Sequence, residues 1–254
     1  MQQQNHTISS LDELLNSNAR TLSCVNLQLS QQFNQSKDQD LIQLQSYLAN
    51  CTEIQILNLD LSGNNFKDNQ IKLLFTDLPG FKNMDTFNLL LNNNNISHQG
   101  VYTLANFFKR FLHFKKLALN LNSLKLQEFV QQKIQLSQSN QLTDLCLRLN
   151  SNQFGDIGIF SIAEALNDEG GQSISLALSK LKDLIDLKLF FDLNQIADFG
   201  SSNLATGLSV CTQITSLELG LISNKIGDKG LQAVGRALKE IKLVIEGFQI
   251  FLQV

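Results

Sequence analysis

The chain has 254 residues, of which 43% are hydrophobic and 17% are charged, and its formal net charge is −3. It can therefore bury a core, but it carries no charge excess that would attract nucleic acid or an anionic membrane. No run of about 18 apolar residues is available to span a membrane. Met1–Ser10 also lacks the basic and apolar regions of a secretory signal, so we expect a cytoplasmic protein with four free thiols.

The first 21 residues are predicted to form a polar N-terminal tail and a capping helix (1–21). Ser10-Leu-Asp-Glu13 has the serine and the glutamate of a capping box, in which each side chain binds a backbone N–H group at the start of a helix. A short helix is therefore expected to begin at about residue 11.

From residue 22 onward the chain repeats one pattern of apolar residues. In one copy the pattern is formed by Ile54, Leu57, Leu59 and Leu61, with an asparagine three residues later. The alternation of apolar and polar residues predicts a short strand with one buried face. Copies of this pattern start at residues 22, 54, 84, 114, 142, 184, 214 and 245.

A helix is predicted to follow the strand of each copy. In the seventh copy Leu231, Val234, Ala237 and Leu238 recur at the spacing of an amphipathic helix. A strand-turn-helix unit of this size buries its apolar face only against neighbouring copies, so the copies should stack into a solenoid. Helices are about 10 Å wide and strands about 4.8 Å apart, so the stack should curve with the strands inside.

The repeat resembles the leucine-rich repeat of the long, helix-containing, ribonuclease-inhibitor-like type, of the kind abundant in ciliate proteins. The stretch from Asn224 to Leu238, Asn-Lys-Ile-Gly-Asp-Lys-Gly-Leu-Gln-Ala-Val-Gly-Arg-Ala-Leu, carries the likeness most strongly, and Leu48-Ala-Asn-Cys-Thr52 and Leu208-Ser-Val-Cys-Thr212 add to it. The resemblance implies an α/β curved horseshoe of about eight repeats over residues 22–254. Its parallel strands would line the concave face and its helices the convex face. It also implies a ladder of asparagine side chains that bind backbone groups at Asn64, Asn94, Asn152, Asn194 and Asn224.

Two departures from the repeat are expected to change the structure locally. Leu124 occupies the asparagine position of the fourth copy, so the ladder should be interrupted there. The interval of 42 residues between the starts at 142 and 184 contains an insertion near 167–183. Two consecutive helical segments are expected in this interval.

The motifs that suggest catalysis have structural explanations in the repeat. Asp198-Phe199-Gly200 matches a protein-kinase tripeptide whose aspartate holds magnesium, but it occupies the same repeat position as Asp228-Lys-Gly230. The other kinase motifs are absent, as are phosphate-binding and dinucleotide-binding glycine motifs. The histidines and cysteines have no metal-ligand spacing. We therefore expect no enzymatic activity, no cofactor and no metal.

The strand residues that point away from the core are the candidates for binding a partner. Most of them are small and polar, which suits a solvated sheet. The exceptions are concentrated in copies five to seven and form the candidate protein-binding site: Arg148, Lys188, Phe190, Glu218 and Ile222. Arginine and aromatic residues are favoured at interface hot spots, although a random scatter of exposed residues gives the same pattern.

This distribution favours a non-enzymatic protein-binding or scaffold module that binds another protein, or is a subunit of a larger assembly, through its concave face. The alternative is a regulatory or targeting region of a larger enzyme, such as a protein kinase or a GTPase regulator.

Overall fold

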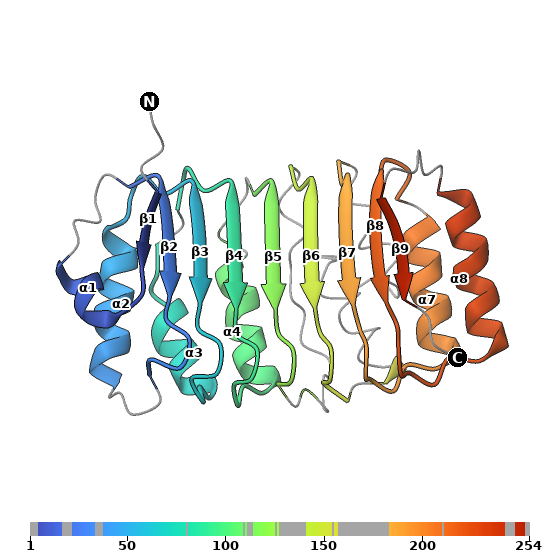
Figure 1. Ribbon diagram of the computed structural model, residues 1–254, viewed down its shortest axis with the longest axis horizontal. Coiled ribbons are helices and arrows are strands. Elements are labelled where there is room, and N and C mark those ends of the chain that lie inside the picture. Colours follow the sequence, from blue (N-terminus) through green and yellow to red (C-terminus); the bar gives the residue numbers. More distant parts are fainter. Residues whose placement is uncertain are drawn as a thin grey trace.

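The protein forms one open parallel sheet whose strands follow each other in chain order (Figure 1). The computed structural model describes residues 5–16, 22–33, 38–79, 81–108, 110, 114–124, 126, 141–153, 155–156, 183–209, 211–241 and 247–251. Nine strands pair in the order β1 to β9. Their bounds are Asn5–Ile8 (β1), Cys24–Gln28 (β2), Ile56–Asp60 (β3), Thr86–Leu90 (β4), Lys116–Asn120 (β5), Asp144–Arg148 (β6), Asp186–Phe190 (β7), Ser216–Gly220 (β8) and Gly247–Phe251 (β9).

The helices lie on one side of this sheet, behind the strands in Figure 1. Consecutive helices contact each other, with α2 beside α3, α3 beside α4, and α7 beside α8. Their bounds are Leu11–Asn16 (α1), Asp38–Asn50 (α2), Asp68–Phe75 (α3), His98–Phe108 (α4), Asp198–Ser209 (α7) and Asp228–Glu240 (α8). The insertion near 167–183, with its two expected helical segments, lies outside the described residues except for Asp183. The fold is therefore an α/β solenoid of leucine-rich-repeat type, as the sequence predicts.

The strands begin where the repeat places them. Each of β2 to β9 starts two residues after the first apolar residue of its copy, and all eight are parallel. The sheet also extends further toward the N-terminus than predicted, because β1 lies within the expected polar tail and pairs with β2 in register Ile8↔Leu27. Helix α1 follows it, and the backbone N–H of Glu13 donates to the Ser10 hydroxyl at its start.

The core lies between the sheet and the helices. The third apolar position of the repeat is buried at Leu59, Leu89, Leu119, Leu147, Leu189 and Leu219. Aromatic residues fill the middle of the stack, where the ring of Phe87 contacts the rings of Phe107, Phe108 and Phe114. All the described helices lie on this side of the sheet, so none of them covers its other face.

The asparagine ladder binds the backbone where the chain leaves each strand. The side-chain nitrogen of Asn152 donates to the carbonyl oxygens of Leu121 and Leu149, at 2.8 and 3.0 Å, and its oxygen accepts the N–H of Leu124 at 2.8 Å. A buried backbone group without a hydrogen-bond partner destabilises the folded state, which explains why the fully buried side chain of Asn152 is an amide. Leu124 has no side-chain group that extends the ladder toward Asn94, so the ladder is interrupted there.

Candidate functional site

The candidate site is the face of the sheet opposite the described helices, and we call it the open face. In β3 and β4 the first, third and fifth residues are partly exposed while the residues between them are buried. Side chains alternate between the two sides of a strand, so these odd positions point away from the helices. The same positions in β2 to β8 make up the open face.

In the part of the open face nearest the N-terminus, asparagine side chains on neighbouring strands form hydrogen bonds with one another. Asn26, Asn58 and Asn88 are cross-strand neighbours, and the side-chain nitrogen of each of the last two donates to the oxygen of the asparagine before it. They line a shallow hollow of about 550 Å³ together with Asp60 and Leu90. Because neighbouring amides satisfy one another, this region offers few unpaired groups to a charged ligand.

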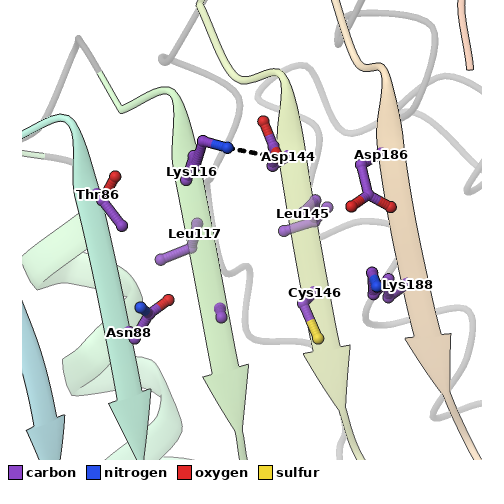
Figure 2. A pocket seen from close by; sticks show the side chains of 10 residues that line it. Thr86, Asn88, Lys116, Leu117, Asp144, Leu145, Cys146, Asp186 and Lys188 are labelled. Carbon is purple, nitrogen blue, oxygen red and sulfur yellow. Dashed lines mark hydrogen bonds and ion pairs between the residues drawn. The ribbon is translucent and has the colours of Figure 1, made fainter. Parts of the chain in front are cut away.

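The middle of the open face contains a second hollow, of about 170 Å³, over strands β4 to β7 (Figure 2). Its small residues are Ala118 and Cys146, which are cross-strand partners. On its rim Lys116 forms an ion pair with Asp144 at 3.0 Å. Asp186 lies beside Asp144 on the next strand and accepts a hydrogen bond from the hydroxyl of Ser216 at 2.9 Å. Small residues among longer charged ones leave this depression in the sheet surface.

A second ion pair closes the hollow toward β8. The ammonium of Lys188 donates to the carboxylate of Glu218 on the neighbouring strand. This hydrogen bond raises the pKa of Lys188, against the lowering effect of its partial burial. Burial raises the pKa of the Cys146 thiol, although the nearby cations of Arg148 and Lys188 act in the opposite direction. The thiol is therefore protonated at neutral pH and is a poor nucleophile.

Arg148 and Phe190 form a stacked pair across strands β6 and β7. They are direct register partners, and the guanidinium carbon of Arg148 lies 4.3 Å from the centre of the Phe190 ring. Gly220 is the register partner on the far side of Phe190. A side chain there would approach the ring, because an added Cβ would lie 3.1 Å from Phe190 Cδ1. The glycine thus makes room for the ring.

The expectation that Phe190 is an exposed ring on this face is wrong. Phe190 is only 8% exposed, while Arg148 above it is exposed. Gly220 leaves space on one side of the ring, and the guanidinium of Arg148 lies over it. Phe190 therefore contributes to packing, and the surface that a partner meets is the guanidinium.

The structure brings four of the five predicted site residues together. Arg148, Lys188, Phe190 and Glu218 lie on the three neighbouring strands β6, β7 and β8. Ile222 lies two residues beyond β8, is partly exposed, and its backbone N–H donates to the carboxylate of Asp192. The hollow over Ala118 and Cys146 was not predicted from the sequence. It could have been predicted from Ala118 and Cys146, two small residues at equivalent positions of neighbouring copies.

Asp198 of the kinase-like tripeptide has a structural role. Its Oδ1 accepts the backbone N–H groups of Gly227 and Gly230, both at 2.8 Å, at the start of α8 in the next repeat. The Phe199 side chain is 64% exposed. In the part of the chain that the structure describes, no group of three or more histidine, cysteine, aspartate or glutamate residues is arranged to hold a metal ion. None of the described helices is long and apolar enough to span a membrane.

The repeat geometry defines the chain as a leucine-rich-repeat-like solenoid. No protein-family model matches its sequence, and no curated protein matches it. Among solved structures, the crystal structure of an internalin (InlF) from Listeria monocytogenes is similar, with 20% sequence identity and a TM-score of 0.38. The match covers 90% of this chain and 63% of the internalin chain, so this chain spans less than two thirds of that protein.

Proposed function

We propose that this chain is a non-enzymatic protein-binding or scaffold module of the ribonuclease-inhibitor-like repeat type. The partner binds on the open face, the concave side of the predicted horseshoe, over strands β5 to β8. The observation that carries the proposal is the contrast between the two parts of this face. Asn26, Asn58 and Asn88 satisfy one another, whereas charged side chains surround a hollow at Ala118 and Cys146.

A parallel sheet held by a continuous core supports this function because it is a rigid platform. A partner that docks on such a surface orders few protein groups, so less of the binding energy is lost to conformational entropy. Ion pairs such as Lys116–Asp144 and Lys188–Glu218 hold their side chains in place at the rim of the hollow. The four free cysteines support a reducing compartment such as the cytoplasm.

Two matched variants test where a partner binds. Ala118→Tyr fills the hollow with a bulky neutral side chain, and Gln232→Tyr places the same side chain at an exposed position on α8. Pull-downs followed by mass spectrometry should recover the same partner with the wild type and with Gln232→Tyr, and lose it with Ala118→Tyr at an unchanged melting temperature. A partner retained by Ala118→Tyr and lost with Gln232→Tyr would place binding on the helices instead.

A further inference from the structure

Arg148 differs from the other cations of strands β5 to β8 in having no acidic partner among the described residues. Lys116 is paired with Asp144, and Lys188 is paired with Glu218. Arg148 is exposed, and the contact that the structure gives its guanidinium is with the face of Phe190. A cation that is exposed and unpaired on an otherwise paired surface is the natural position for an incoming anion.

The stacked arrangement prepares Arg148 for a planar anion. The Phe190 ring has no oxygen or nitrogen that accepts a hydrogen bond, so this contact leaves the five N–H donors of the guanidinium available to an incoming anion. Phe190 is buried against Gly220, so the platform under the guanidinium is fixed. An arginine held in this way loses little freedom when it forms the paired hydrogen bonds that carboxylates accept.

The hollow lies next to this arginine on the same strand. Cys146 and Arg148 are two residues apart on β6, so both side chains face the partner at a spacing of about 6–7 Å. This spacing equals that of side chains two residues apart in an extended segment. The floor of the hollow is formed by Ala118 and Cys146, which suit an aliphatic side chain.

We propose that Arg148 binds an aspartate or glutamate of the protein partner, while an aliphatic side chain two residues away in an extended segment occupies the hollow over Ala118 and Cys146. This inference rests on the proposed function and specifies the chemistry of the partner. The charges agree with this proposal, because among the described residues of strands β5 to β8 Arg148 is the cation without an acidic partner. The neighbouring Asp144 already pairs with Lys116.

The test uses a library of random twelve-residue peptides displayed on phage and selected on the full chain. Enriched peptides should share an acidic residue two positions from Leu, Ile, Val or Met. Synthetic copies of one such peptide, titrated by fluorescence anisotropy, should bind Arg148→Glu and Arg148→Gln at least about tenfold more weakly than the wild type. Replacing the acidic residue of the peptide with lysine should restore binding to Arg148→Glu. Arg236→Glu, an equal charge change at an exposed position on α8, should leave binding unchanged.

Each other result overturns the inference. Enriched peptides with a basic residue in place of the acidic one would indicate that Asp186, not Arg148, is the anchor. Peptides that bind Arg148→Glu and Arg148→Gln as well as the wild type, but lose binding to Ala118→Tyr, would refute the role of Arg148 and leave open-face binding intact. Peptides unaffected by all three variants, or a library without any enriched peptide, would count against both proposals.

Discussion

The Asp198 carboxylate occupies the space that a side chain at position 230 would need. Its Oδ1 accepts the backbone N–H of Gly230 at 2.8 Å, and a Cβ added to this glycine would also lie 2.8 Å from that oxygen. The same Cβ would lie 2.2 Å from the Oγ of Ser201, which is fully buried. The glycine therefore permits close approach of two repeats.

Gly230→Ala and Gly235→Ala are expected to have opposite effects on stability, although both glycines lie in α8. An added methyl group at position 230 should lower the free energy of unfolding by about 1–3 kcal/mol through overpacking. At position 235 no atom lies within 4 Å of the added Cβ. Alanine should therefore raise the free energy of unfolding there by about 0.5–1 kcal/mol through its better helix propensity. Urea denaturation of both variants measures this, and equal signs would contradict the packing argument.

Asp198→Ala should lower the free energy of unfolding by about 1–3 kcal/mol, because it leaves the N–H groups of Gly227 and Gly230 without their acceptor. Asp228 is the matched control. It occupies the same repeat position in α8, is exposed, and accepts no hydrogen bond among the described residues. Asp228→Ala should change stability by less than about 0.5 kcal/mol.

Purified wild-type protein should also show no magnesium-dependent ATP hydrolysis. ATP turnover that Asp198→Ala abolishes would refute the structural role of Asp198.

Leu193→Asn is expected to stabilise the protein. Leu193 has a φ of 56°, in the left-handed region that a leucine rarely adopts, and its side chain is 58% exposed. Asn93 and Gly63 occupy the equivalent positions of earlier copies with φ values of 58° and 65°. Asparagine should therefore relieve about 0.5–1 kcal/mol of backbone strain with little loss of burial. Alanine also disfavours the left-handed region, so Leu193→Ala should not raise the melting temperature. Thermal denaturation of both variants measures the difference.

Phe190→Ala should destabilise the protein as well as weaken partner binding. The ring is buried under Arg148, so its loss leaves a cavity and removes the support of the guanidinium. We expect a loss of about 3 kcal/mol in the free energy of unfolding. Lys188→Ala, on the same strand but partly exposed, should cost less than about 1 kcal/mol. An unchanged melting temperature for Phe190→Ala would restore the view of Phe190 as a free contact residue.

The buried cysteines should make stability decrease at high pH. Burial raises the pKa of Cys51 from 9.0 to about 12 in the folded protein. The unfolded thiol, with its ordinary pKa, loses its proton first, so the stability contributed by this group is complete below about pH 9 and is lost as the pH rises toward 12. Cys51→Ala should therefore lose less stability than the wild type between these pH values. Parallel pH slopes in denaturant titrations of the two proteins would contradict this.

The repeat pattern predicted the strands well because the spacing of Leu57 and Leu59 recurs almost unchanged. It did not predict β1, because Asn5-His-Thr-Ile8 lacks that spacing and is held by pairing with β2. The burial of Phe190 was missed for a related reason. Its environment depends on Arg148 and Gly220, which are distant in sequence and become neighbours only through the strand register. Single copies of the repeat carry no information about such cross-strand partners.

The capping aspartates give the solenoid a direction. Asp68 binds the N–H groups of Ser97 and Gly100, and Asp198 binds those of Gly227 and Gly230, so in both cases a repeat completes the helix start of the next repeat. Loss of a repeat therefore exposes backbone donors at the helix start of its C-terminal neighbour. The asparagine ladder makes the N-terminal neighbour depend on the lost repeat as well, because the side-chain oxygen of Asn94 accepts the N–H groups of Asn64 and Phe66. The aspartate contacts and the asparagine ladder thus act in opposite directions along the chain, so unfolding that starts within the stack should spread toward both ends.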